Sequence, residues 1–177
     1  MRTRYLMTGT LVAGLTLSLL NWFTAAILPP RFKQFKDTQT VVETIRANVS
    51  GNNIYTAPQG LFVAVSLRAD LSSRIQNFGP HIAGQFAIEF AVALGLSLLL
   101  LTVPGRSPMY AASFFGLTGL IAGIETHFTH WNWDGFPASH LLAGSAYLAG
   151  NWFVAGLVLG TIRRRLELRK SLQLTKQ

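Results

Sequence analysis

Residues 82–103 read IAGQFAIEFAVALGLSLLLLTV, a run in which Glu89 is the one ionisable side chain. A helix of about 20 mainly apolar residues crosses a hydrocarbon core of about 30 Å, because each residue advances the helix by about 1.5 Å. Pro104 follows the run directly, and a proline in this place ends a helix because it lacks an amide hydrogen. The run therefore predicts a transmembrane helix.

Three further segments have the same apolar character. One ends at the pair Pro29-Pro30, one follows Pro108, and one ends at the three arginines 163–165. The first run is longer than the about 7 to 15 apolar residues of a secretory signal, so we expect it to remain as an uncleaved anchor. The four predicted spans are residues 5–28, 82–103, 109–128 and 136–162.

The composition of the whole chain agrees with a lipid environment. Of its 177 residues 50% are apolar and 12% are charged, and the mean hydropathy is +0.35. Soluble globular domains carry about 25% charged residues. The chain has no cysteine, which excludes disulfides, thiolate metal sites and cysteine nucleophiles. We predict a single all-α membrane domain, a four-helix transmembrane bundle with a partly structured outer loop at residues 29–81.

The distribution of Lys and Arg predicts the orientation of the chain. An even number of spans puts both termini on one side, and nine of the fifteen basic residues lie there. These nine are Arg2, Arg4, Arg106, Arg163, Arg164, Arg165, Arg169, Lys170 and Lys176. Because basic residues near span ends mark the cytoplasmic side, we expect a multi-pass membrane protein with both termini in the cytoplasm.

The basic tail at residues 163–177 has two candidate partners, anionic lipid and nucleic acid. Membrane attachment favours lipid, because each basic residue near an anionic surface contributes about 1 kcal/mol of binding. We therefore expect the bilayer as a partner and no nucleic acid.

The outer loop carries its own local signals. Asp37 followed by an apolar stripe at helical spacing predicts a short helix that ends near Asn48. The run 61–67 is rich in Val and Phe and predicts an extended segment. Residues 71–78 suit an amphipathic helix at the membrane interface.

Glycines recur at a spacing of four residues in the last two predicted spans, at Gly119 and Gly123 and at Gly156 and Gly160. Such pairs let helix backbones approach closely, which is how helices associate in lipid. Internal packing of the bundle is the favoured interpretation. The alternative is a helix face that docks another subunit.

Three polar residues are expected inside the membrane, Asn21 in the first span and Gln85 and Glu89 in the second. An ionised side chain at the bilayer centre costs at least about 2.5 to 3.5 kcal/mol, so such groups usually face the bundle interior and have partners. We therefore expect Glu89 to accept hydrogen bonds across the bundle, from Asn21, Gln85 or a histidine.

A second polar group near the outer ends of the last two spans is the candidate cofactor site. His127, His130 and His140 are candidate ligands of a haem or a chlorophyll-type pigment, and Glu125 with His127 and His130 is a candidate set for a divalent metal. Imidazole and carboxylate both ligate first-row metals. Glu125 and His127 point about 200° apart on a helix, which weakens the metal hypothesis.

The favoured interpretation of this polar group is structural, because His and Trp side chains are common where one end of the side chain is in water. The chain contains neither an HExxH zinc motif nor a Gly-x-Ser-x-Gly nucleophile motif. We therefore assign no catalytic residue.

The segment WNWDGFP at residues 131–137, followed by GNWFVAGLVLG at residues 150–160, resembles a group of small uncharacterised bacterial inner-membrane proteins. These proteins have a Trp-x-Trp-x-Gly-Phe-Pro segment before the last span. The resemblance implies an inner-membrane location and brings no established activity, so it assigns no role to any residue.

Taken together, these patterns predict a small accessory or structural subunit of a larger inner-membrane complex, which docks through helix faces and the outer loop. We expect no enzymatic activity. Two alternatives stay open: a membrane oxidoreductase or metal- or tetrapyrrole-binding protein that uses the His and Glu cluster, and a small transporter or channel.

Overall fold

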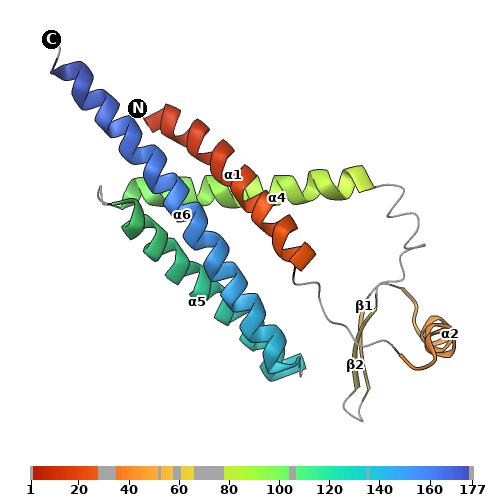
Figure 1. Ribbon diagram of the computed structural model, residues 1–177. Helices are drawn as coiled ribbons and strands as arrows, with labels where there is room; N and C mark the ends of the chain where they lie inside the picture. The colour runs from red at the N-terminus through yellow and green to blue at the C-terminus, as the bar shows by residue number, and fades with distance from the viewer. Residues whose placement is uncertain are drawn as a thin grey trace. The chain divides into compact units, whose positions relative to one another are not determined.

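The computed structural model describes residues 2–27, 35–51, 53–57, 61–65, 78–103, 107–134 and 136–175. The chain divides into two compact units, the first made of Met1–Leu28 and Ile82–Gln177 and the second of Pro29–His81. Figure 1 shows the four long helices of the first unit, and a helix with a two-stranded hairpin in the second. The second unit has the bounds predicted for the outer loop.

The first unit contains α1 (Arg2–Ile27), α4 (Phe78–Thr102), α5 (Pro108–Asp134) and α6 (Ala138–Leu174). Among the residues that the structure describes, three stretches are long and apolar enough to cross a membrane, namely Arg2–Thr24, Ile82–Thr102 and Ala138–Leu174. The helix α5 is not among them, and its sequence turns polar from Glu125 onward. The span predicted at residues 109–128 lies within α5 and stays a prediction.

The helices of the first unit follow the predicted spans but differ from them at their ends. The helix α5 continues past residue 128 to Asp134, and α6 continues through the three arginines to Leu174. The basic tail is therefore helical over most of its length. The predicted ends were based on apolar content. Arg, Leu and Lys are also good helix formers in water, so α6 continues as a helix through its basic residues.

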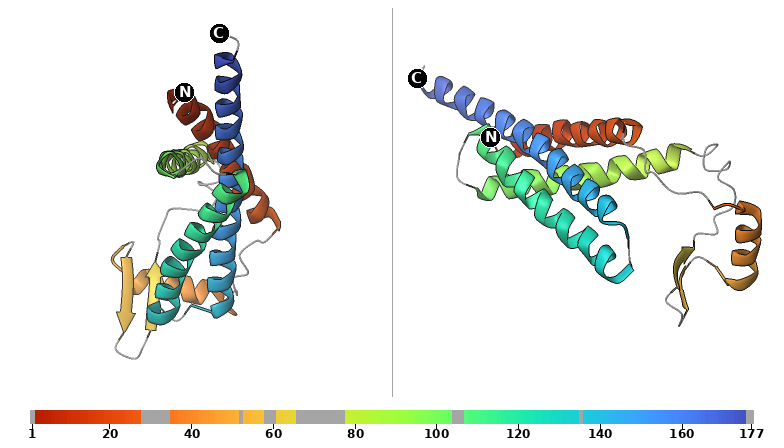
Figure 2. Two further views of the ribbon diagram at one scale, coloured as in Figure 1. Left: turned by 90° about the vertical axis from the view of Figure 1, so that its left-hand side faces the viewer. Right: turned by 60° about the horizontal axis from the view of Figure 1, so that its bottom comes forward.

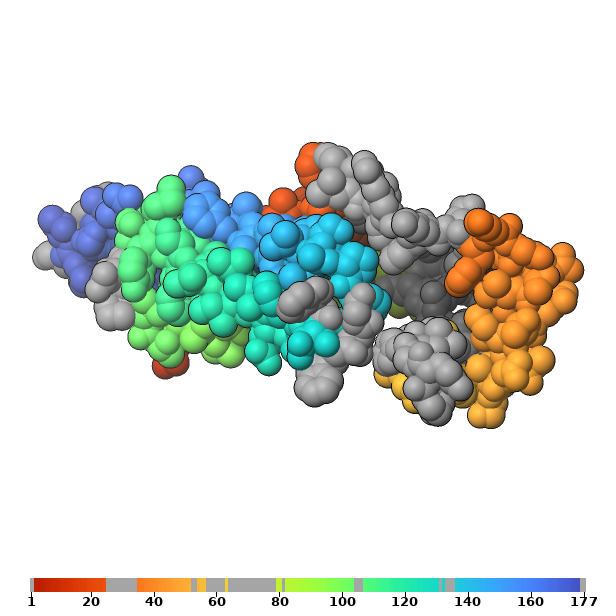
Figure 3. Space-filling view, turned by 90° about the horizontal axis from the view of Figure 1, so that it is seen from below, coloured from red at the N-terminus to blue at the C-terminus, as the bar shows by residue number. Residues whose placement is uncertain are grey.

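The helices α5 and α6 lie against each other along most of their lengths, as the ribbon and space-filling views show (Figures 1, 2 and 3). The helix α1 lies along the middle of α6, from near Tyr147 to near Arg163, and α4 crosses both helices obliquely (Figures 1 and 2). All four helices contribute to one core. Its buried members are Tyr5, Ala13 and Leu17 of α1, Ala93, Leu96 and Leu100 of α4, Ala111 and Phe115 of α5, and Ala155 and Leu159 of α6.

Both predicted glycine pairs lie between α5 and α6. A Cβ atom added to Gly123 would lie 2.7 Å from the Ser145 Cα, and one added to Gly156 would lie 2.6 Å from the Ala111 carbonyl oxygen. Gly119 and Gly160 are equally close to the backbone of the facing helix. These contacts support the interpretation of the two pairs as internal packing.

The second unit contains α2 (Thr38–Asn48) and the antiparallel hairpin β1 (Asn53–Ala57) and β2 (Leu61–Val65), in which Tyr55 pairs with Val63. The predicted short helix is confirmed, and β2 confirms the extended run over residues 61–65. The sequence analysis predicted no strand at residues 53–57, where the structure has β1. The interfacial helix predicted at 71–78 lies outside the described residues except for Phe78, which begins α4.

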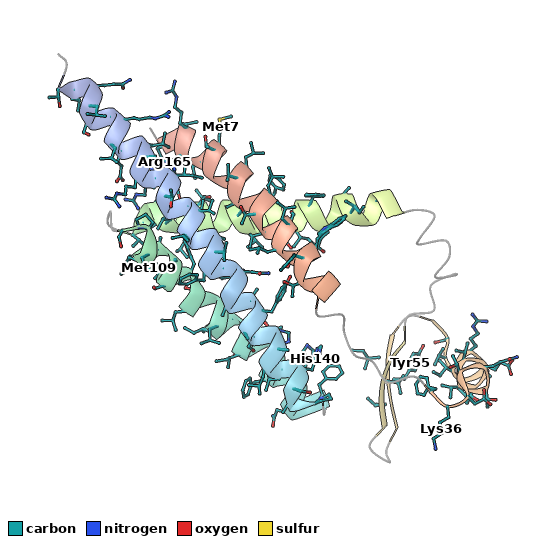
Figure 4. All side chains as sticks on the ribbon, in the orientation of Figure 1. Met7, Lys36, Tyr55, Met109, His140 and Arg165 are labelled. Carbon is teal, nitrogen blue, oxygen red and sulfur yellow. The ribbon has the colours of Figure 1, made fainter. Side chains whose placement is uncertain are left out.

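Polar contacts fix the start of α2 and the turn before β1 in the second unit. Asp37 is the N-cap of α2, and its carboxylate accepts hydrogen bonds from the Thr40 hydroxyl at 2.7 Å and from the Thr40 backbone N–H at 3.0 Å. The Tyr55 hydroxyl, labelled in Figure 4, donates to the Gly51 carbonyl at 2.9 Å and accepts from the Gly51 N–H at 3.1 Å. The hairpin is therefore tied to the turn that precedes it.

We predict that α2 loses helix content in acid. The Thr40 hydroxyl and then the Thr40 N–H hold the pKa of Asp37 below its usual value. A lowered folded-state pKa means that the capping contribution is complete above the unfolded pKa and is lost as the pH falls through the folded one. Amide chemical shifts of residues 38–48, followed by NMR in the full-length chain, measure this loss. Asp37→Asn keeps an acceptor without an ionisation and removes the pH dependence.

A second prediction concerns the contact between α5 and α6. Gly156→Ala lowers the free energy of unfolding by about 1 to 3 kcal/mol, because the new methyl group meets backbone atoms that cannot turn away. Gly150→Ala on the same helix is the matched control, since no atom of the described residues lies within 4 Å of its Cβ position. Thermal unfolding of both variants in detergent checks the difference, and equal stabilities would contradict it.

Candidate functional site

A buried carboxylate lies where α1 and α4 cross. Glu89 of α4 is 6% exposed, and its Oε1 accepts hydrogen bonds from the Asn21 amide nitrogen of α1 and, at 2.7 Å, from the Gln85 amide nitrogen one turn earlier on α4. Two donors on one oxygen offset part of the cost of taking a carboxylate out of water. The three polar residues predicted to lie together in the membrane are therefore neighbours in the structure.

The polar network extends from Asn21 to α6. The Asn151 amide nitrogen donates to the Asn21 carbonyl oxygen at 3.1 Å, and Asn151 is 7% exposed. Tyr147, one turn before Asn151, lies beside Asn151 and Thr24. Asn21 thus donates to α4 and accepts from α6, and the polar side chains connect three helices that are far apart in the sequence.

Sequence reasoning missed Asn151 as a member of this network. A signal for it exists, because Asn151 is the one side-chain amide within the predicted span 136–162 and an amide in lipid needs a partner. The pattern did not indicate which helix would supply that partner. This group of side chains can hold α1, α4 and α6 together through hydrogen bonds.

Three histidines, His127, His130 and His140, lie near the end of α5 and the start of α6. The rings of His127 on α5 and His140 on α6 lie 6.0 Å apart edge to face, and Phe136 lies 5.9 Å from His140 and 5.6 Å from His130 between ring centres. Figure 4 labels His140 near this end of α6. Gly144 makes room for the imidazole, because a Cβ there would lie 2.4 Å from the His127 Nε2.

The structure brings together His127 and His140 but not the predicted metal set of Glu125, His127 and His130. The helix α5 is continuous through these positions, so Glu125 and His127 project from different sides. Among the described residues, no three His, Asp or Glu side chains lie close enough to hold a metal ion. The side chain of Asp134 lies outside the description, and ligation of a haem or pigment by the histidines stays a prediction.

Arg163 is a functional side chain of the fold that the sequence reasoning assigned only to the tail. In a helix the Leu100 carbonyl accepts from the N–H of residue 104, but residue 104 is proline and has none. The Arg163 Nη1 donates to the Leu100 carbonyl at 2.6 Å and to the Val103 carbonyl at 2.8 Å, and its Nε donates to Glu167 at 3.0 Å. Arg163 of α6 therefore caps the C-terminal end of α4.

The chain matches no known protein family. Comparisons with curated proteins and with solved structures also found no match. The resemblance of the segment at residues 131–137 to small inner-membrane proteins stays a prediction. The side chains of Trp131 and Trp133, which carry that resemblance, lie outside the described residues.

We predict that Glu89→Leu destabilises the helical unit. Leucine fills a similar volume but leaves the amide groups of Asn21 and Gln85 without their acceptor, which costs about 1 to 3 kcal/mol per unsatisfied group. Glu89→Gln keeps a carbonyl oxygen at this place and has the smaller effect. Thermal unfolding in detergent measures both.

The control is Glu125→Leu, which removes an exposed carboxylate from α5 and leaves stability within about 0.5 kcal/mol of the parent protein. If the Glu89→Leu variant melts at the same temperature as the parent protein, the network does not hold the helices together.

Proposed function

We propose that this chain is a small accessory or structural subunit of a larger complex in the bacterial inner membrane. In this proposal four helices span the membrane as a bundle, with α5 as the fourth span, both termini lie in the cytoplasm, and residues 29–81 lie outside. The excess of basic residues near the two termini supports this orientation.

The observation that carries the proposal is an open small-residue face on α4. Gly84, Ala91 and Gly95 are exposed, and no atom of the described residues lies within 4 Å of the Cβ position of either glycine. These positions recur at helical spacing and therefore share one face, together with Ile88, which is 59% exposed. Most other glycines of the four long helices already touch a neighbouring helix.

An open face of this kind fits another transmembrane helix. Lipid tails remove the hydrophobic incentive for association, so helices in membranes pair where small residues let the backbones approach. The glycine pairs of α5 and α6 are used in internal packing, which leaves α4 as the surface for docking. The partner we infer is a helix of a different polypeptide that places its own side chains over Gly84 and Gly95.

The second unit offers a further docking surface. The helix α2 carries Val41, Val42 and Ile45 at helical spacing, and none of its residues is buried. An amphipathic helix keeps its apolar stripe when that stripe has something to cover it. This agrees with a subunit that engages its complex both within the membrane and next to it.

Site-specific photo-crosslinking in the native membrane tests the proposal. A photoreactive residue at Gly95 or Ala91 gives one crosslinked product of defined mass. With the photoreactive residue at Ala91, Gly84→Leu with Gly95→Leu abolishes the product, because leucine fills the open face. Gly150→Leu is the matched control, since its Cβ position is equally open but lies on α6. Crosslinks to lipid alone would overturn the proposal, as would crosslinks to a second copy of this chain.

A further inference from the structure

A pocket lies in the first unit at the end where α1 begins and α4 finishes. It has a volume of 270 Å³ and is lined by Arg2 and Tyr5 of α1, Leu101 of α4, and Arg163, Leu166 and Glu167 of α6. Figure 4 labels Met7 on α1 and Arg165 on α6 near this end of the unit. The pocket belongs neither to the open face of α4 nor to the histidine cluster.

Tyr5 forms the buried part of the pocket wall. It is 2% exposed, and its hydroxyl is closed off from the open volume and lies beside the Ser97 hydroxyl. The groups that can reach a ligand in the pocket are therefore the charged side chains of its lining.

The charges around the pocket favour a negatively charged ligand. Two guanidinium groups line it, against the single carboxylate of Glu167, and that carboxylate is already paired with the Arg163 Nε at 3.0 Å. The contacts of Arg163 use Nε and Nη1, which leaves the two N–H groups of Nη2. Arg2 begins α1, so the first N–H groups of that 26-residue helix, the positive end of its dipole, lie here as well.

The position of the pocket favours a lipid headgroup as the negative group. The apolar stretches of α1 and α4 end here, which is where lipid headgroups lie if these helices span a membrane. Leu101 and Leu166 give one apolar wall, next to the charged one. Basic pockets between helix ends on the cytoplasmic side of a membrane are known to bind anionic headgroups.

We propose that this pocket binds the phosphate of an anionic phospholipid, with Arg2 and Arg163 as the charged donors. A guanidinium presents paired N–H groups that match two phosphate oxygens. The site uses α1, the end of α4, and α6. It therefore requires membrane insertion but not the docking of a partner on the glycine face of α4.

The test measures how much lipid stays on the purified full-length chain. Native mass spectrometry after incubation with dioleoyl phosphatidylglycerol or dioleoyl phosphatidylcholine gives the retained lipid per chain. We expect preferential retention of phosphatidylglycerol, and a decrease of about tenfold in Arg2→Gln, the change expected for one lost charge-assisted hydrogen bond. Arg169→Gln, an exposed position of α6 outside the pocket, retains lipid as the parent protein does.

Arg2→Gln separates a binding role from a structural one. Arg2 is an exposed side chain, so the lipid-free variant melts near the temperature of the parent protein while its lipid retention falls. Arg163 is left unchanged in the test, because it also caps α4.

Three results would overturn the proposal. They are equal retention of the two lipids, an equal loss in Arg169→Gln, and displacement of phosphatidylglycerol by millimolar inorganic phosphate, which would assign the pocket to a free phosphate. None of these results changes the crosslinking at Gly95, so the failure of the lipid site and the failure of the docking proposal are distinguishable.

Discussion

The packing of three helices depends on how one carboxylate is satisfied. Glu89 lies within an apolar helix and is almost fully buried, and its acceptor oxygen receives amide hydrogens from its own helix and from α1. Without water to replace those donors, any sliding of α1 past α4 leaves both a carboxylate and an amide unsatisfied. The Asn151 amide extends the same constraint to α6. The relative position of α1, α4 and α6 is therefore specified by hydrogen bonds in a core that is largely apolar.

The helix α5 is held by a different physical device. Its glycines, and those of α6, let the two backbones touch, so the fit between these helices is steric. Dispersion contacts of this kind act over short distances and lose strength quickly when a gap opens. The first unit thus combines directional polar bonds around Asn21 with close backbone packing along α5 and α6, and the two devices share the apolar core that contains Phe115 and Leu159.

Much of the helical structure was predictable from sequence, because apolar runs, prolines and the cap at Asp37 are local signals. The neighbours Asn21, Gln85 and Glu89 were also predictable, since a buried carboxylate needs donors. The oblique crossing of α4 was not, nor was the choice of Asn151 as a partner, because both depend on contacts between segments more than 60 residues apart. Histidine spacing likewise carries no information on how the loop after α5 turns, so the pairing of His127 with His140 required the structure.

The capping of α4 by Arg163 has a consequence for the order in which the protein is made. Leu100 precedes Arg163 by 63 residues, so the carbonyl groups at the end of α4 leave the ribosome well before the guanidinium that bonds them. Until α6 has been synthesised, those carbonyls depend on other donors for their hydrogen bonds. Synthesis of α6 then supplies the cap of α4. In a nascent chain truncated before Arg163, the carbonyls at the end of α4 lack that cap.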